Sequence, residues 1–381
     1  MILGIDTHNL RSGGGKNYII ELLNSSKPDN IFFEKIHIWG SEKLLNKIND
    51  KSYIIKHNER YLNSNYPNNI FSYILRIYWH IFLLKNDAKH NKCDLVFFQG
   101  SYNLSGVKNY VCINLNILPF EKNLFNKIGF STRYIKFKLL KYLYLFSYKK
   151  SLGLIFLSNL SKKLINDEHK LNIKKFSIVP LGLKKQFFKT NQFSNFKTNN
   201  YKIIYISPFD FYKHQKNVFL AIKKLSIKYN IKLYFIGDGK NKYANSFKSL
   251  KIKNDPQDSF SKILNNLSED ELISFYHNSD IKIFASETEA LPTIILEAMG
   301  SRMPIACSNV EPMKSILKNA AIFFNPNKIQ SIVNAVEKLI IDEELRNTLS
   351  NRAFNLAKNF NWYDISKETL EFLYLSIKNK S

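Results

Sequence analysis

Cysteine is scarce in this sequence: there are 3 among 381 residues, and Cys93, Cys112 and Cys307 lie far apart without any C-x-x-C spacing. This spacing excludes a disulfide framework and a cysteine-based zinc site. Because such cysteine usage is typical of a reducing compartment, we expect a cytoplasmic protein.

Long apolar runs are also missing. No stretch of about 20 apolar residues occurs, which is the length that a membrane-spanning helix needs. The nearest candidate, residues 70–84, is short and is interrupted by Arg76 and His80. Residues 1–6 have no basic start and no small-residue cleavage site, so we expect a strand there and not a signal peptide.

Acidic residues are few beside basic ones, 31 against 56, which gives a formal net charge of +25. This excess favours a polyanionic partner, either a membrane surface with acidic lipids or nucleic acid. Part of it has a simpler source, since chains rich in Asn, Lys and Ile are typical of AT-rich genomes. A chain of 381 residues can form two domains with separate cores, and 45% hydrophobic residues exclude a largely disordered protein.

The most informative stretch that is present spans residues 281–300. Residues 281–284 predict a buried parallel strand, and a loop with Glu287 and Glu289 follows its carboxyl end. Pro292 suits the first turn of a helix, whose core-facing stripe is predicted at Ile294, Ile295, Ala298 and Met299. A strand, a polar loop and a helix N-terminus form the usual anion site of an α/β protein.

Glu289 and Glu297 stand eight residues apart in E-A-L-P-T-I-I-L-E-A-M-G-S-R-M-P-I-A. This stretch resembles the E-x7-E region of glycosyltransferase family 4. The members of that family are retaining, nucleotide-sugar-dependent enzymes with the GT-B fold. The resemblance therefore implies an α/β protein with two Rossmann-like parallel-sheet domains facing across a cleft.

The resemblance also implies roles for this stretch. It places Glu289 beside the donor sugar as a catalytic residue, and Glu297 where it accepts hydrogen bonds from the ribose hydroxyls. The loop between them belongs to the donor site, through Ala290, Leu291, Pro292 and Thr293. Glu287 lies outside the pattern, and we expect a solvated loop residue.

A glycine run, residues 13–15, lies between the first predicted strand and a helix pattern. Consecutive glycines allow the backbone to approach a ligand while helix N–H groups point at phosphate, although a plain flexible loop explains the run equally well. The resembled family has a glycine-rich loop at this place facing the donor diphosphate, which implies that Gly14 and Gly15 bind the donor.

Lys213 lies eight residues before Ala221, at the place of the lysine that family members direct at the donor phosphates. A point charge on a flexible stem suits a leaving diphosphate, so Lys213 is expected to bind the donor and assist catalysis. The arginine that the family often has five residues earlier is Pro208 here, and Lys216 is a candidate to complete the cationic clamp. No two aspartates stand two apart, so the D-x-D metal site of the other large glycosyltransferase fold is missing. We expect neither a metal nor a cofactor.

Two polar loops are candidates for the acceptor side, one beginning at Gln99 and the other containing Asn116. The second loop resembles a family segment that often carries a histidine, and Leu115 occupies that place. Asn116 suits a sugar hydroxyl, and a polar loop cap is an equally good explanation.

Residues 122–150 are basic and aromatic and contain no acid. On a helix, Arg133, Lys136 and Lys141 lie on one flank, with apolar residues opposite. This pattern suits a helix on an anionic membrane surface, where each basic group contributes about 1 kcal/mol. The alternative is a core helix of the first domain whose lysines extend to solvent.

The alternation of apolar runs and helical patterns restarts after a polar stretch, residues 189–200. We predict an acceptor-side domain at 1–188, a nucleotide-sugar-binding domain at 201–361, and a final helix, 362–381, crossing back to the first domain as in the resembled family.

The primary hypothesis is a retaining, metal-independent hexosyltransferase at the inner face of the cytoplasmic membrane, moving sugar from a UDP- or GDP-sugar to a lipid-linked or cell-surface glycan. One alternative is a GT-B enzyme that epimerises or hydrolyses a nucleotide sugar. The other, a nucleic-acid-binding protein, is suggested by charge alone. We expect no nucleic-acid partner, because no nucleic-acid fold motif is present.

Overall fold

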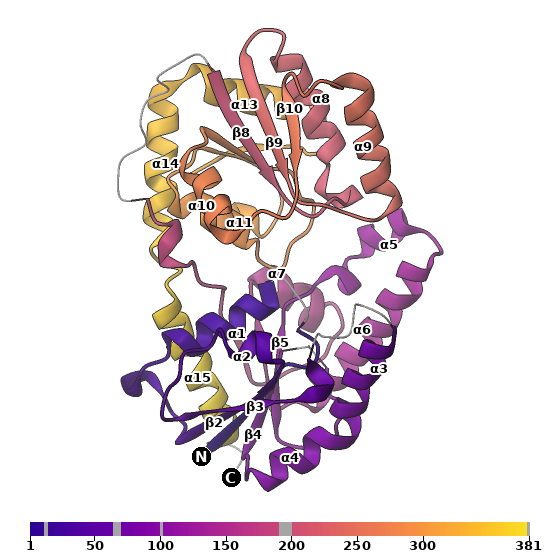
Figure 1. The fold of residues 1–381 in the computed structure, drawn as a ribbon, viewed down its shortest axis with the longest axis vertical. Helices are drawn as coiled ribbons and strands as arrows, with labels where there is room; N and C mark the ends of the chain where they lie inside the picture. The colour runs from indigo at the N-terminus through magenta and orange to yellow at the C-terminus, as the bar shows by residue number, and fades with distance from the viewer. Residues whose placement is uncertain (11–13, 64–69, 100–101, 190–199, 379–381) are drawn as a thin grey trace. The chain divides into compact units, whose positions relative to one another are not determined.

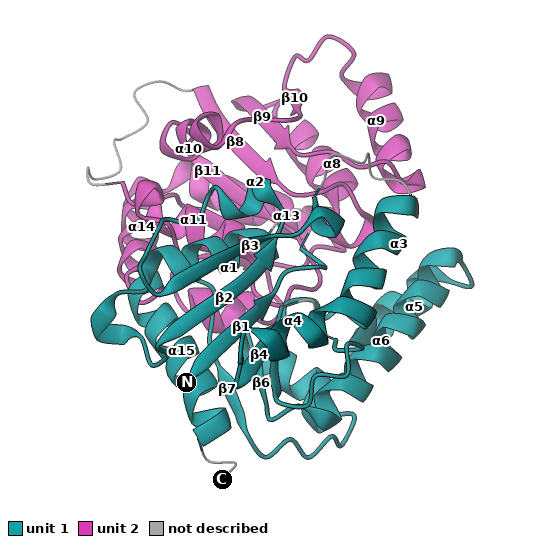
Figure 2. Cartoon of the chain, turned by 60° about the horizontal axis from the view of Figure 1, so that its bottom comes forward, with its two compact units in different colours: residues 1–182, 362–381 teal, residues 183–361 magenta. Residues whose placement is uncertain are grey.

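The computed structural model describes residues 1–10, 14–63, 70–99, 102–189 and 200–378. The glycine at position 13 and most of the predicted linker lie outside the described residues. The chain divides into two compact units, residues 1–182 with 362–381 and residues 183–361 (Figure 2). The second unit thus begins with the η6 turn (Lys185–Phe187), which packs against helices of that unit.

Unit 1 contains a seven-stranded, entirely parallel sheet within its described residues, in the order β3-β2-β1-β4-β5-β6-β7 (Figure 1). The strands are β1 (Ile2–Asp6), β2 (Lys35–Gly40), β3 (Ile54–Asn58), β4 (Leu95–Phe98), β5 (Tyr110–Asn114), β6 (Gly153–Phe156) and β7 (Phe176–Ile178). The helices are α1 (Gly14–Ser25), α2 (Glu42–Leu45), α3 (Ile70–Tyr78), α4 (Leu84–His90), α5 (Lys122–Ile128), α6 (Thr132–Lys150), α7 (Asn159–Lys162) and α15 (Trp362–Lys378), with a π-helical turn, η3 (Trp79–Leu83), between α3 and α4.

The C-terminal helix α15 belongs to unit 1 and packs against α1. The Ser366 hydroxyl donates to the Leu22 carbonyl at 2.9 Å, and the Tyr18 and Thr369 hydroxyls lie 3.3 Å apart. These contacts bury the apolar face of α1, so the end of the sequence completes the core that its beginning starts.

Unit 2 contains a six-stranded parallel sheet within its described residues, in the order β10-β9-β8-β11-β12-β13. The strands are β8 (Asn200–Ile206), β9 (Asn230–Ile236), β10 (Ser261–Leu264), β11 (Ile281–Phe284), β12 (Ile305–Ser308) and β13 (Ile322–Phe324). The helices are α8 (Gln215–Leu225), α9 (Lys242–Asn254), α10 (Glu269–His277), α11 (Thr293–Gly300), α12 (Met313–Leu317), α13 (Ile329–Ile341) and α14 (Glu343–Ala357), with a short turn, η7 (Phe211–Lys213), before α8.

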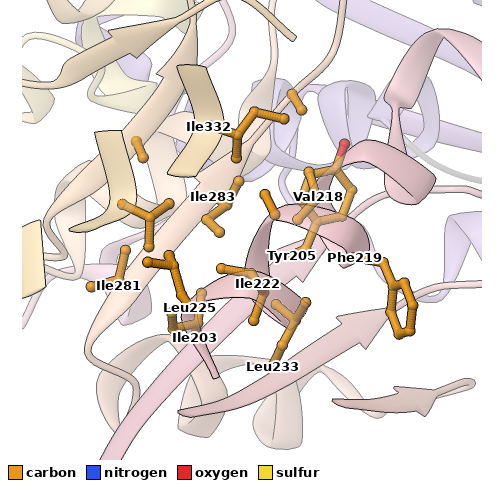
Figure 3. Close-up of a cluster of buried hydrophobic side chains, with 14 of the residues drawn as sticks. Ile203, Tyr205, Val218, Phe219, Ile222, Leu225, Leu233, Ile281, Ile283 and Ile332 are labelled. Carbon is orange, nitrogen blue, oxygen red and sulfur yellow. The ribbon is translucent and has the colours of Figure 1, made fainter. Parts of the chain in front are cut away.

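The two faces of β11 point to different surroundings. Ile281 and Ile283 enter a core cluster with side chains of α8, α9 and α13, and Figure 3 shows both in this cluster, Ile281 near Leu225 of α8 and Ile283 near Ile332 of α13. Because side chains alternate along a strand, Lys282 and Phe284 point to the opposite face, where the Lys282 ammonium lies over the Tyr276 ring of α10. A lysine therefore lies inside the stretch predicted as a buried apolar strand.

Both sheets have the doubly wound order in which the strand sequence reverses once, between β1 and β4 in unit 1 and between β8 and β11 in unit 2. The predicted fold class, an α/β protein with two Rossmann-like parallel-sheet domains, is confirmed. No helix within the described residues has both the length and the apolar character needed to cross a bilayer.

Candidate functional site

The candidate donor residues of unit 2 gather where its strand order reverses. The loop after β8 carries Lys213, and the loop after the adjacent β11 carries Glu289 and leads into α11. Ligands of doubly wound proteins bind at this position, outside the carboxyl ends of the two strands.

Lys213 and Glu289 form an ion pair between the lysine Nζ and the glutamate Oε1. The ammonium also lies over the Tyr212 and Phe284 rings, at 5.0 and 5.6 Å from their centroids. Lys213 is almost completely buried, so its charge is desolvated and Glu289 is its anionic partner in the structure. A phosphate group could take over the same ammonium.

Local contacts hold the Lys213 backbone in place. The Tyr205 hydroxyl donates to the Lys213 carbonyl, and the Asp210 carboxylate caps the η7 turn by accepting from Phe211 N–H at 2.9 Å. The tight turn after β9 supports the same loop, because a Cβ at Gly237 would lie 2.2 Å from the Ser207 carbonyl oxygen. Only glycine fits there, and its φ of +134° is one that other residues rarely adopt.

Glu287 is not the solvated residue that we expected. Its Oε1 lies 3.0 Å from His214 Nε2 and accepts from Asn327 Nδ2 at 2.9 Å, and its side chain is largely buried. His214 adopts a left-handed backbone conformation with φ of +55°. The contact between Glu287 and His214 thus holds His214, which directly follows Lys213, in place.

The helix after β11 begins at Thr293, so Pro292 is at the N-cap position and not in the first turn, where we expected it. Ala290 and Leu291 are buried, and Ser286 is tied to β12 because its carbonyl accepts from the Ser308 hydroxyl at 2.6 Å. The first N–H groups of α11 have no intrahelical partner, which makes this end attractive to anions.

Glu297 lies one turn further along α11, and its Oε2 accepts a hydrogen bond from the Tyr276 hydroxyl of α10 at 2.7 Å. Burial raises the pKa of the Glu297 carboxyl, opposed by this hydrogen bond and by the charge of Lys282. Burial lowers the pKa of Lys282 to about 7, and the Glu297 charge works in the other direction. The sequence did not indicate Tyr276 or Lys282 as site residues; a lysine between two core isoleucines was the available signal for Lys282.

Neither Lys216 nor Pro208 adds a second cation beside Lys213 in the structure. Lys216 directs its ammonium to the Ser246 hydroxyl of α9 at 2.6 Å, and to the Tyr243 ring. Pro208 contributes its carbonyl, which accepts from Gln215 Nε2 at 2.9 Å. In the structure, the Lys216 ammonium is thus engaged with side chains of α9.

In unit 1, Gly14 and Gly15 are the first two residues of α1. A Cβ at Gly14 would meet nothing within 4 Å, whereas one at Gly15 would lie 3.0 Å from Leu10 Cδ2 and 3.1 Å from Leu115 Cδ1. Leu115, at the place where the resemblance suggests a histidine, thus packs against the start of α1.

The acceptor-side candidates differ in their surroundings. Gln99 follows β4 and is buried, and neither its Oε1 nor its Nε2 has a hydrogen-bond partner among the described residues. Asn116 caps its own loop, since its Oδ1 accepts from Leu118 N–H at 3.0 Å, and its side chain also bonds to Tyr144. Gln99 has spare hydrogen-bonding capacity, and Asn116 has the capping role that we considered as its alternative.

A buried cluster of Asp6, His8 and His80 lies at the end of β1. Asp6 Oδ2 lies 2.6 Å from His8 Nδ1 and 3.2 Å from His80 Nδ1, and the two rings stack with centroids 3.9 Å apart. Burial disfavours the Asp6 carboxylate, but its interactions with His8 and its hydrogen bond with His80 outweigh this effect and hold its pKa well below the usual range.

Three such side chains have the composition of a metal site, but their hydrogen bonds do not suit one. Leu104 N–H donates to His80 Nε2 at 2.9 Å, so that nitrogen carries no proton and the neutral ring holds its proton on Nδ1. His80 Nδ1 therefore donates to Asp6 and has no lone pair for a metal. The cluster is a hydrogen-bonded support for the end of β1.

Comparisons with known proteins bear on the site in unit 2. Residues 186–356 match the family described as "Glycosyl transferases group 1". An O-antigen chain mannosyltransferase B of Escherichia coli is 27% identical over 23% of both chains, and an uncharacterized glycosyltransferase of Haemophilus influenzae is 24% identical over 72% of this chain and 74% of its own. For three of the curated relatives, the matched part spans only 20% to 29% of the relative's length.

Solved structures are similar over nearly the whole chain. Sucrose-phosphate synthase from Thermosynechococcus elongatus has a TM-score of 0.76 with 13% identity, covering 100% of both chains. An Anabaena protein in complex with UDP and glucose has a TM-score of 0.69 with 13% identity, covering 97% of this chain and 98% of its own. These proteins share the GT-B fold. The matched family and these two curated relatives are glycosyltransferases, and the solved structures show the fold.

Proposed function

We propose that this protein is a retaining glycosyltransferase that moves a hexose from a UDP- or GDP-sugar to a lipid-linked or cell-surface glycan. The observation that carries the proposal is the buried Lys213–Glu289 pair at the reversal point of the second sheet, directly before the N-terminus of α11. A desolvated cation and a helix N-terminus at one place suit a diphosphate.

Each site residue has a part in this proposal. Lys213 and the α11 N–H groups stabilise the leaving diphosphate, Glu297 accepts hydrogen bonds from the ribose hydroxyls, and Glu289 turns to the donor sugar once phosphate engages Lys213. For unit 1, Gly14 and Gly15 at the start of α1 and the buried Gln99 stay predicted substrate contacts. In this scheme a divalent cation is not required.

The transfer step breaks the bond between the anomeric carbon and the phosphate oxygen and forms a bond from that carbon to the acceptor oxygen on the same face. The acceptor proton passes to the departing phosphate oxygen, which accounts for retention without a separate general base. The names of two similar proteins support the substrate classes, an O-antigen chain mannosyltransferase and a protein solved with UDP and glucose.

The proposal is tested by transfer assays with UDP- and GDP-sugars on wild type and Glu297→Ala, with thermal unfolding as a check of the fold. We expect Glu297→Ala to lose transfer while it stays folded, and Glu337→Ala, which removes the acidic partner of the exposed Lys228, to keep it. Full activity of Glu297→Ala would falsify the assignment. Release of free sugar or of an epimer without an acceptor would favour the hydrolase or epimerase alternative.

We also propose that unit 1 attaches the enzyme to the inner face of the cytoplasmic membrane, through residues 122–150. One face of α6 packs inward, with Phe137, Tyr144 and Tyr148 buried, while Leu139 and Tyr142 stay 58% and 66% exposed. Helix α3, which lies beside α6 in Figures 1 and 2, is also apolar on its outer side. Helix α6 thus combines the two possibilities that its sequence allowed, because it has both a core face and an exposed apolar face.

Charge supports an anionic surface as the partner of this face. Helix α6 has no acidic residue, and four of its lysines are exposed beside the apolar residues: Lys136, Lys138, Lys149 and Lys150.

Vesicle sedimentation tests the attachment. We expect binding to vesicles with acidic lipids, weak binding to neutral ones, and a loss of about fivefold or more in a Leu139→Ser, Tyr142→Ser double variant. Ile227→Ser, at an 87% exposed site of unit 2, is the control and should bind normally.

A further inference from the structure

Lys282 is an anomaly in the core of unit 2. It stands in the central strand β11, its exposed fraction is 0%, and its Nζ has no hydrogen-bond partner among the described residues. Burying an ammonium without a partner is unfavourable, and an apolar residue of similar size at this place is expected to stabilise the fold. A feature that costs stability beside a candidate binding site calls for a functional explanation.

The surroundings of Lys282 connect it to Glu297. Its Nζ lies 5.2 Å from the centroid of the Tyr276 ring, and the hydroxyl of that ring donates to Glu297 Oε2 at 2.7 Å. The titratable groups that interact with Lys282 are Glu297 of α11 and Cys307 of β12, and Glu297 also interacts with Lys184 and Glu269.

We propose that Lys282 is a positioning residue of the donor site, whose buried ammonium lies behind Glu297 and keeps that carboxylate ionised to receive the donor ribose. The inference rests on the proposed function, in which Glu297 accepts hydrogen bonds from the ribose hydroxyls. Tyr276 orients the carboxylate through one oxygen, and Lys282 supplies the opposite charge from the strand beneath it.

A consequence is that donor binding takes up a proton. Because the pKa of Lys282 is about 7, its side chain is neutral in most molecules of the free protein at about pH 8. A bound nucleoside diphosphate adds negative charge and fixes Glu297 in its ionised form, and both effects favour the protonated lysine. The affinity for the nucleotide therefore falls as the pH rises above about 7, because the proton must then be taken from solution.

Titration calorimetry of UDP and GDP at about pH 8, in buffers of different ionisation enthalpy, measures this proton directly. We expect proton uptake by the wild type and a clear loss of it in Lys282→Met, together with affinity about tenfold weaker at pH 7, which corresponds to a coupling of one pKa unit. Lys202→Met is the matched control: Lys202 lies on the neighbouring strand β8 over Phe275 of α10, but it interacts with Asp280 and not with Glu297.

The outcomes separate this inference from the proposed function. Equal proton uptake by wild type and Lys282→Met, or no uptake by the wild type, would overturn the role of Lys282 while leaving the donor site in place. A wild type that binds neither nucleotide would contradict the proposed function itself. If Lys282→Met does not fold, the wild-type measurement still decides, and Lys282→Gln gives a second neutral variant.

Discussion

The two reversal points of this protein have the same topology and different chemistry. In unit 2, the loops after β8 and β11 carry Lys213 and Glu289, and the Lys282 Nζ of β11 has no hydrogen-bond partner among the described residues. In unit 1, β1 ends in Asp6, whose carboxylate accepts from both His8 and His80 and from His8 N–H at 2.9 Å. In unit 2 the charged side chains can exchange their present partners for a ligand, whereas in unit 1 the Asp6 carboxylate is fully hydrogen-bonded within the protein.

This difference shows how one fold serves a binding site and a support. A charge satisfied by three internal donors stabilises the chain near it, whereas an ammonium with no hydrogen-bond partner lowers stability unless something binds. Variants at the two places should therefore behave in opposite ways: changes in unit 2 affect activity more than stability, and changes in unit 1 do the reverse.

The largest expected effect is on transfer by Lys213→Met. Removing the cation that faces the leaving diphosphate should lower kcat by about 100-fold to 1000-fold, as for the loss of a preorganised group that stabilises transition-state charge. Steady-state transfer kinetics measure it. Lys216→Met, which loses contacts to Ser246 and to the Tyr243 ring, should change kcat little. Equal losses of kcat in both variants would contradict a specific role of Lys213.

Asp6→Asn should lower the free energy of unfolding by about 3 kcal/mol at pH 7, because both histidines lose their anionic acceptor in a buried place. Since the folded pKa of Asp6 is depressed, its contribution is present at neutral pH and is lost as the pH falls below about 4. Chemical denaturation of wild type and variant at pH 7 and at a pH below about 4 measures the change in the free energy of unfolding. The control is Asp50→Asn, at an exposed ion pair with Lys56, which should have little effect.

Lys282→Met should raise the melting temperature. The folded pKa of Lys282, about 7, lies below its ordinary value of 10.5, so the charged lysine costs stability at and below pH 7, on the order of a few kcal/mol. This cost disappears as the pH approaches 10.5, and with it the advantage of methionine. Thermal unfolding at pH 7 and pH 10 measures the difference, and a variant that is less stable at pH 7 would contradict the assignment of an unsatisfied charge.

The smallest expected effect separates Gly14 from Gly15. Gly14→Ala meets open space and improves helix propensity, so it should stabilise unit 1 by up to about 1 kcal/mol. Gly15→Ala must displace Leu10 and Leu115 and should lose that gain. Thermal unfolding of the two variants side by side checks the order, which a reversed ranking would contradict.

Sequence patterns predicted the fold because alternating apolar runs and helical spacings are local, and they predicted the neighbourhood of Glu289, Glu297 and Lys213 because a resemblance aligned them. They did not indicate the partners that reach these residues from elsewhere. Tyr276 meets Glu297 from another helix, and His80 meets Asp6 across 74 positions of sequence. Such contacts are set by tertiary packing and have no local pattern.

The most direct test of the account is hydrogen–deuterium exchange of the protein with and without saturating UDP or GDP. We predict slower exchange in residues 207–216 and 285–300 of unit 2, where Lys213 and the start of α11 lie, and unchanged exchange around Asp6 and η3 of unit 1. Protection of the unit 1 cluster without protection of these two unit 2 segments would contradict the claim that the second reversal point is the nucleotide site.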